Sequence, residues 1–167
     1  MALIPPIGAS AGDDGARADD GPDSEEYEVY SALVEEVFVT EASASGPVFI
    51  RDRTGCLKFI VERHASGIDA VRPETWEVFK AKNAREYPLE ERFNLSVGCD
   101  LVNVRDDAGA RGIVGLSRVG FDSEKSQALV HVDEIAAWYI SSGSFVLLVK
   151  ENGAWRVEEI AMTYLGE

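Results

Sequence analysis

The chain has few of the residues that usually build metal and redox sites. Its 167 residues include only two cysteines and two histidines. The sequence has no set of Cys and His at the spacing of a zinc site. It also has no phosphate-binding loop, nucleophile elbow or dinucleotide-binding fingerprint. We therefore expect no metal and no cofactor, and we do not expect one of the common enzyme classes that these motifs identify.

Positive charge is also scarce. Lys and Arg number 16 against 30 Asp and Glu, so the net charge is −14 at pH 7. Such a chain repels nucleic-acid phosphates and anionic lipid surfaces, so we expect no nucleic acid as a partner. No apolar run reaches the ~20 residues of a membrane-spanning helix, so we expect no membrane span. The excess of acid would attract a cationic protein, but it would equally serve to keep the protein soluble.

Residues 1–23 differ in composition from the rest of the chain. The stretch "SAGDDGARADDGPD" has no apolar periodicity, and its acids do not have the spacing of a calcium loop. We expect a disordered acidic tail over 1–23, followed by one α+β domain over 24–167.

The first ordered segment is "SEEYEVYSALVEEVF", which begins at Ser24. Asp23 or Ser24 can act as the N-cap, and Glu25 and Glu26 suit the positive end of the helix dipole. Apolar residues then recur at the spacing of one helix face. These are Tyr30, Leu33, Val34, Val37 and Phe38. The pattern predicts a helix.

The middle of the chain predicts three further elements. Residues 47–63, "PVFIRDRTGCLKFIVER", contain two runs whose side chains would alternate between the two faces of a sheet. The turn signal "DRTG" separates the runs, so the stretch predicts a β-hairpin. Residues 72–88 suit a short helix, because Pro73 fits the first turn and Trp76 and Phe79 share a face. The stretch "CDLVNV" predicts a short strand.

The C-terminal half predicts an antiparallel meander. Asn152-Gly153 is the strongest hairpin signal in the chain. The apolar residues of the last strand have odd numbers up to Val157 and even numbers from Ile160 onward. This change predicts a β-bulge near Glu158-Glu159. We place the strands at 113–121, 127–132, 145–149 and 155–164, with a turn over "DSEKS". The expected fold is α+β: an N-terminal helix, a hairpin, a short second helix and a curved four-stranded antiparallel sheet packed on helix.

Several of these stretches resemble one group of proteins. "SRVGF", "QALV" and "FVLLVKENGAW", together with "YSALVEEVF" and "FKAKN…YPLEERF", resemble uncharacterised, mostly exported bacterial proteins over most of residues 27–164. No activity is established for that group. The order of elements also resembles NTF2-like and cystatin-like domains, whose curved sheets wrap a helix. This second likeness rests on fold pattern alone and implies no function.

His131 and Asp133 are the candidate catalytic residues. They lie two positions apart on one predicted strand, so their side chains share a face. A histidine beside a carboxylate can exchange protons near neutral pH. The alternative is an exposed histidine on a solvated face.

Three other residues are candidates for binding. Arg118 follows Ser117 and could bind an anion, although an internal salt bridge is expected in so acidic a protein. Trp138 and Tyr139 fall in a long predicted loop between Asp133 and Ser144. They would contact a ligand or partner there, or else cap the core.

These observations favour a non-catalytic binding or interaction module that takes an unknown small molecule or a cationic protein. Two alternatives stay open. One is an NTF2-like pocket enzyme that uses His131 and Asp133, and the other is an acidic inhibitor or immunity-type partner of a basic protein. A pocket that contains His131 would favour the enzyme, and a one-sided cluster of carboxylates would favour the inhibitor.

The N-terminus generates a testable expectation about export. Ala9-Ser10-Ala11 has the small-x-small form of a cleavage site, so Met1 to Ala11 is expected to be the tail of a signal peptide; a cytoplasmic protein with a disordered leader is the alternative. Export would permit a Cys56–Cys99 disulfide worth about 2–4 kcal/mol. We expect mass spectrometry of the protein from its native host to find a mature chain that starts at Gly12. A cytosolic chain that starts at Met1 or Ala2 would contradict export.

Overall fold

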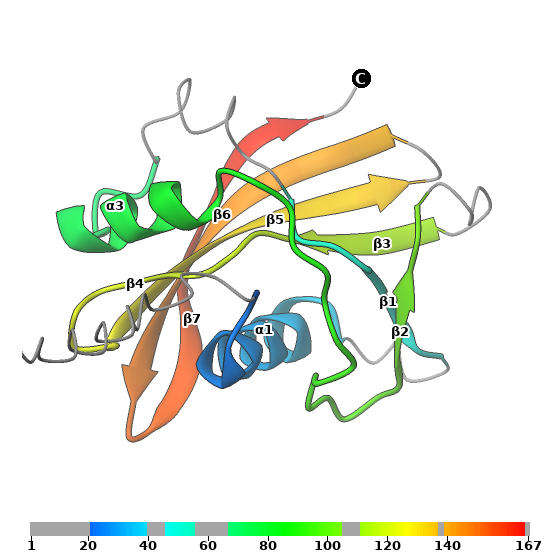
Figure 1. Ribbon diagram of the computed structural model, residues 1–167, viewed down its shortest axis with the longest axis horizontal. Helices are drawn as coiled ribbons and strands as arrows, with labels where there is room; N and C mark the ends of the chain where they lie inside the picture. Colours follow the sequence, from blue (N-terminus) through cyan, green and yellow to red (C-terminus); the bar gives the residue numbers. More distant parts are fainter. Residues whose placement is uncertain (1–20, 40–45, 56–66, 105–110, 137–138, 166–167) are drawn as a thin grey trace, which may run out of the picture.

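The computed structural model describes residues 21–39, 46–55, 67–104, 111–136 and 139–165, and these residues build two helices and one sheet (Figure 1). The predicted tail therefore lies outside the described residues, apart from its last three. No helix in the described part of the chain is long and apolar enough to cross a membrane. The elements are α1 (Ser24–Val37), β1 (Val48–Arg51), α3 (Pro73–Lys82), β2 (Cys99–Val102), β3 (Arg111–Leu116), β4 (Gly120–Phe121), β5 (Gln127–Ala136), β6 (Tyr139–Glu151) and β7 (Ala154–Leu165).

The sheet has seven strands in the order β2-β1-β3-β5-β6-β7, with β4 paired to β5 beyond the end of β3. Strand β1 runs parallel to both β2 and β3, and the remaining pairs are antiparallel. The expected α+β class is confirmed, and the last strands are consecutive antiparallel neighbours as predicted. The predicted sheet of four strands was too small, because it left out β1 and β2 and counted β3 and β4 as one.

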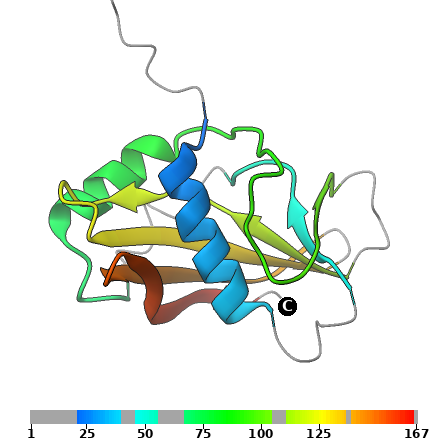
Figure 2. The same cartoon turned by 90° about the horizontal axis from the view of Figure 1, so that it is seen from below.

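The two helices lie on opposite faces of this sheet (Figures 1 and 2). Alternate residues of each central strand therefore enter different cores. Ala128, Val130 and Val132 of β5 pack toward α1, as the alternation predicted, whereas Leu129 packs toward Phe79 of α3. Strands covered on both faces read as nearly continuous apolar runs, which explains "ALV" and "FVLLV".

Helix α1 begins as its sequence predicts. The Asp23 side chain accepts a hydrogen bond from the Glu26 backbone N–H, and the Glu26 carboxylate accepts one from the Asp23 N–H. This capping box satisfies two backbone donors that the helix itself leaves unpaired. Tyr30, Leu33 and Val34 are fully buried, which confirms the predicted apolar face.

Helix α3 packs directly on the backbone of β4. Pro73 occupies its first turn and the rings of Trp76 and Phe79 stack at 5.6 Å, both as predicted. A Cβ atom at Gly120 would lie 2.5 Å from the Cβ of Phe79 and 2.6 Å from the carbonyl oxygen of Thr75. Only glycine therefore permits this contact between the helix and the strand.

The predicted hairpin over 47–63 was wrong in its pairing. At Phe49 and Ile50 both edges of β1 are already occupied, by β2 and by β3. No edge is left there for an antiparallel partner, and the second predicted arm, 57–62, lies outside the described residues. The alternation of side chains between two faces identifies a strand, but it does not tell which distant strand lies next to it.

The predicted strand over 113–121 is broken in two. Leu116 pairs with Val132 and Gly120 with Leu129, so the three residues Ser117–Val119 lie opposite only two of β5. The Ser117 N–H donates to the His131 carbonyl, and the His131 N–H donates to Ser117 Oγ. These bonds hold β5 to the chain where the strand ladder is interrupted.

The hairpins at the C-terminal end follow the local signals. Asn152 and Gly153 have φ of 51° and 80°, as a tight two-residue turn requires. Val157 pairs with Leu148 and Glu159 with Leu147, so Glu158 is the extra residue and the predicted bulge is confirmed. The predicted loop from Asp133 to Ser144 was wrong, because β5 continues to Ala136 and β6 already begins at Tyr139.

The contact at Gly120 predicts a strong effect of one methyl group. We expect Gly120→Ala to lower the free energy of unfolding by about 1–3 kcal/mol, because the added Cβ must displace α3. Gly46→Ala is the control, since a Cβ there would meet none of the described residues within 4 Å and the backbone is not in the left-handed region. Urea unfolding followed by circular dichroism measures both. Equal midpoints for the two variants would contradict this packing.

Candidate functional site

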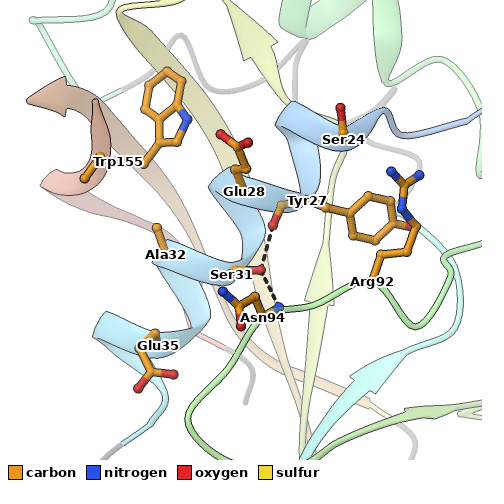
Figure 3. Close-up of a pocket in the computed structure, with 10 residues that line it drawn as sticks. Ser24, Tyr27, Glu28, Ser31, Ala32, Glu35, Arg92, Asn94 and Trp155 are labelled. Atoms are coloured by element: carbon orange, nitrogen blue, oxygen red, sulfur yellow. Dashed lines mark hydrogen bonds between the residues drawn. The ribbon is translucent and has the colours of Figure 1, made fainter. Parts of the chain in front are cut away.

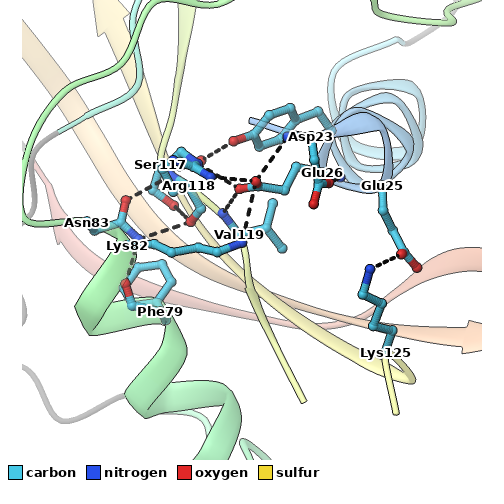
Figure 4. A network of polar contacts seen from close by, with 11 residues as sticks. Asp23, Glu25, Glu26, Phe79, Lys82, Asn83, Ser117, Arg118, Val119 and Lys125 are labelled. Atoms are coloured by element: carbon cyan, nitrogen blue, oxygen red, sulfur yellow. Dashed lines mark hydrogen bonds and ion pairs between the residues drawn. The ribbon is translucent and has the colours of Figure 1, made fainter. Parts of the chain in front are cut away.

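Arg118 forms a buried ion pair with Glu26 (Figure 4). Its Nε lies 2.9 Å from Glu26 Oε1 and its Nη2 lies 2.8 Å from Oε2, so the contact is bidentate. Glu26 is 0% and Arg118 3% exposed. The predicted internal salt bridge is confirmed. The role of Arg118 in binding a ligand stays a prediction, and its guanidinium is already paired with a carboxylate.

The Glu26 carboxylate gathers donors from three segments of the chain. Besides Arg118, it accepts hydrogen bonds from the backbone N–H of Asp23 and Val119, and Lys82 Nζ lies 3.4 Å away. The Asn83 side chain accepts from the Arg118 N–H and donates to the Arg118 carbonyl. This Glu26 network joins α1, the C-terminal end of α3 and the break between β3 and β4.

His131 and Asp133 are brought together but are not open to solvent. His131 is 1% exposed, and its Nδ1 lies 3.5 Å from Asp133 Oδ1. Its Nε2 lies 3.1 Å from Thr163 Oγ1, and its ring packs edge to face on Phe145 at 5.0 Å. The expectation of an exposed histidine was wrong, because this face of β5 is covered. A catalytic role for the pair stays a prediction.

The two aromatic candidates and the two cysteines are placed only in part. Trp138 and Cys56 lie outside the described residues, and Tyr139 is the first residue of β6. Cys99 carries a free thiol in β2. Partial burial, followed by the nearby Asp100 carboxylate, raises the pKa of this thiol to about 11. The thiol is therefore protonated at neutral pH and is a weak nucleophile. A disulfide with Cys56, which would require export to an oxidising compartment, stays a prediction.

A cavity of about 460 Å³ lies over the outward face of α1, and we call it the α1 trough (Figure 3). Helix α1 forms its floor, the segment with Arg92 and Asn94 forms one wall, and the start of β7 forms the other. Small side chains on the floor leave room for a ligand. The lining residues are Ser24, Tyr27, Glu28, Ser31, Ala32, Glu35, Arg92, Asn94, Ala154 and Trp155.

One wall of the trough is held by hydrogen bonds to α1. The Tyr27 hydroxyl accepts from the Glu90 N–H, and the Ser31 hydroxyl accepts from the Asn94 N–H. The guanidinium of Arg92 lies 4.8 Å from the centre of the Tyr27 ring. The segment that carries Arg92 and Asn94 is therefore positioned by the helix beside it.

The carboxylates of the floor differ in their partners. Glu35 accepts hydrogen bonds from both the backbone N–H and the hydroxyl of Ser96, and the hydroxyl bond is the main reason that its pKa is lowered. Glu28 is exposed, and the described part of the chain offers it no hydrogen bond or ion pair. Glu28 therefore has no countercharge among the described residues.

Trp155 forms the opposite wall. Its side chain is 6% exposed and packs against Phe121, and Lys150 Nζ lies 5.2 Å from its ring centre. Its indole nitrogen lies on the ring edge that faces α1 (Figure 3). Among the described residues this buried N–H has no hydrogen-bond acceptor.

The sequence predicted α1 and the position of Trp155 but not the trough itself. Glu28 and Glu35 are spaced by seven residues on the polar side of the predicted helix, next to the small residue Ala32. That pattern is typical of any solvated helix face. Arg92 and Asn94 reach this face only through the path of the chain between α3 and β2, for which no local signal exists.

The comparisons and the geometry assign no further chemistry to these sites. No group of three metal-ligating acidic, His or Cys side chains occurs among the residues that the structure describes. The chain matches no model of a known family, no curated protein and no solved structure. The resemblance to exported bacterial proteins and to NTF2-like domains accordingly stays an expectation.

The Glu26 network predicts a coupled effect on stability. We expect Arg118→Met to cost about 3–5 kcal/mol, because it leaves a buried carboxylate without its main partner. The double variant Glu26→Met/Arg118→Met should cost less than the sum of the two single variants, since it removes both charges.

Denaturant unfolding of the three variants measures this coupling. Lys80→Met serves as the control, because the Lys80–Glu77 pair is on the surface and should be worth less than about 1 kcal/mol. Additive losses in the double variant would contradict a buried pair that acts as one unit.

Proposed function

We propose that this protein is a non-catalytic binding module that takes a cationic segment of a partner protein in the α1 trough. The net charge of −14 supports a cationic partner, because it attracts positive charge at long range and speeds encounter. The trough is the place where that attraction can become a specific contact, because it combines a cavity with an unpaired carboxylate.

The observation that carries this proposal is the state of Glu28. The neighbouring carboxylate of Glu25 is already paired with Lys125 at 2.6 Å and with Lys150 at 3.1 Å. The hydrogen bond from Lys125 is the largest of the effects that lower the Glu25 pKa. Glu28 has no such partner among the described residues. A lysine or arginine from another protein would supply the missing charge.

The walls of the trough support a peptide-like ligand. The N–H of Trp155 is buried and has no acceptor among the described residues, so a peptide carbonyl could accept from it only after the indole ring turned toward the trough. The aliphatic stem of a lysine or arginine can pack over Ala32 and Ala154 while its charged end reaches Glu28. The ligand would thus be recognised by its charge and by the aliphatic stem that carries this charge.

A pocket enzyme has less support. The side chain of His131 is 1% exposed and its ring is packed on Phe145. A substrate could reach this histidine only if the surrounding core opened. The α1 trough, which is open to solvent, contains neither His131 nor Asp133.

Charge reversal at one position tests the proposal. We expect Glu28→Lys to weaken binding of an octalysine peptide about tenfold, because it replaces an attraction by a repulsion. Glu159→Lys is the matched control. It changes the net charge equally, but Glu159 is an exposed residue of β7 that pairs with Leu147 on the α3 side of the sheet.

Isothermal titration calorimetry measures the affinities, and the indole N–H resonance of Trp155 reports where the peptide lies. The expected result is a shift of this resonance by the peptide in the wild-type protein and in Glu159→Lys. Equal loss of affinity in both variants would show that binding follows net charge alone, and the proposal would fail.

A further inference from the structure

A second cavity lies where two parallel strands end. Strands β1 and β2 pair in register from Val48–Cys99 to Arg51–Val102, so their carboxyl ends lie side by side at one end of the sheet. A cavity of about 360 Å³ opens there, lined by Arg51, Asp52, Arg53, Glu86, Asn103 and Val104. In open α/β sheets ligands bind outside the carboxyl ends of parallel strands. The pair β1 and β2 forms such an edge within a mostly antiparallel sheet.

Two of the charges in this cavity neutralise each other. Arg51 Nη2 lies 2.7 Å from Glu86 Oε1, and both side chains are only partly exposed. This pair fixes the direction of the Arg51 guanidinium and leaves some of its N–H donors for another acceptor. It contributes no net charge to the cavity.

Asp52 and Arg53 are different, because their side chains have no partner. Neither side chain forms an ion pair or a hydrogen bond within the described part of the chain, and they do not pair with each other. Elsewhere Arg118, Arg51 and Arg72 are all bound to carboxylates. Arg156 also lacks a carboxylate partner among the described residues, but it is an exposed residue outside this cavity, whereas Arg53 lines the cavity.

The backbone that carries these two residues is held on both sides. The Asp52 N–H donates to the Val102 carbonyl at 2.9 Å, and the Asp52 carbonyl accepts from the Leu89 N–H at 2.9 Å. Arg53 forms a bridge with Pro88. Main-chain bonds therefore set the backbone positions of the two residues, while their charged ends remain available to a ligand.

The combination of charges limits the ligand. A dianion would be attracted by Arg53 but repelled by Asp52. A simple cation would be attracted by Asp52 but repelled by Arg53. A ligand that carries both charges satisfies both side chains. We propose that this cavity binds a small zwitterion, of which a free α-amino acid is the simplest kind.

In this arrangement each charged group of the ligand has one partner. The ligand carboxylate accepts from the Arg53 guanidinium, whose planar donors match it in bidentate form. The ligand ammonium donates to Asp52. Of the six described residues that line the cavity, Val104 alone is apolar, so a ligand with a polar side chain fits better than an apolar one. The site is separate from the α1 trough and shares no residue with it.

Titration calorimetry with free glutamine as the probe tests this inference on the full chain. We expect Arg53→Gln and Asp52→Asn each to weaken glutamine binding at least about tenfold. Arg156→Gln and Asp100→Asn are the matched controls, because they make the same chemical changes at exposed positions outside the cavity. The controls should bind glutamine as the wild type does.

Analogues with one charge decide between a zwitterion and a simple anion. N-acetylglutamine lacks the cation and glutamine methyl ester lacks the anion, so both should bind at least about tenfold more weakly than glutamine. Amide resonances of residues 51–53 and 103–104 should shift with glutamine and return to their free positions in Asp52→Asn. Tight binding of N-acetylglutamine or inorganic phosphate that survives Asp52→Asn would overturn the inference. So would the absence of any glutamine binding to the wild type.

Discussion

One buried carboxylate, that of Glu26, holds together segments that lie far apart in the sequence. It faces Arg118 through two hydrogen bonds and also accepts from the Val119 N–H. Two charges this deeply buried are tolerated only as a pair, because each alone would lose its hydration without compensation. The strand ladder breaks at Ser117–Val119, where Arg118 reaches α1. We infer that this ion pair is the physical reason for the break, and that it sets the position of α1 on the sheet.

The position of α1 in turn creates the α1 trough. Because its N-terminal turn is tied to Arg118, the helix lies against the sheet with Glu28 and Ala32 facing outward. The segment with Asn94 is bonded to Ser31 on one side, and Trp155 stands on the other. The surface that we propose for a cationic partner therefore depends on a buried contact that the partner never touches.

The two cavities use charge in opposite ways. In the α1 trough the unpaired carboxylate of Glu28 shares its helix face with a second acid, Glu35, which suits a positively charged segment. The cavity at the ends of β1 and β2 is lined by both an unpaired acid, Asp52, and an unpaired base, Arg53. The first depends on the overall charge of the chain and should weaken with salt. The second depends on a local balance of charges that composition does not reveal.

The sequence by itself determined the elements whose causes are local. The capping box at Asp23, the turn at Asn152-Gly153 and the bulge at Glu158 all follow from residues a few positions apart, so they could be predicted. The parallel neighbours of β1, the break at Ser117–Val119 and the burial of His131 could not. Each depends on which distant segment packs against the residue. Neither the alternation of apolar residues nor the strand propensity of a segment identifies that partner. Arg118 shows the division most clearly: its need for an internal carboxylate could be read from the acidic composition, but only the tertiary structure decided that the carboxylate would be Glu26.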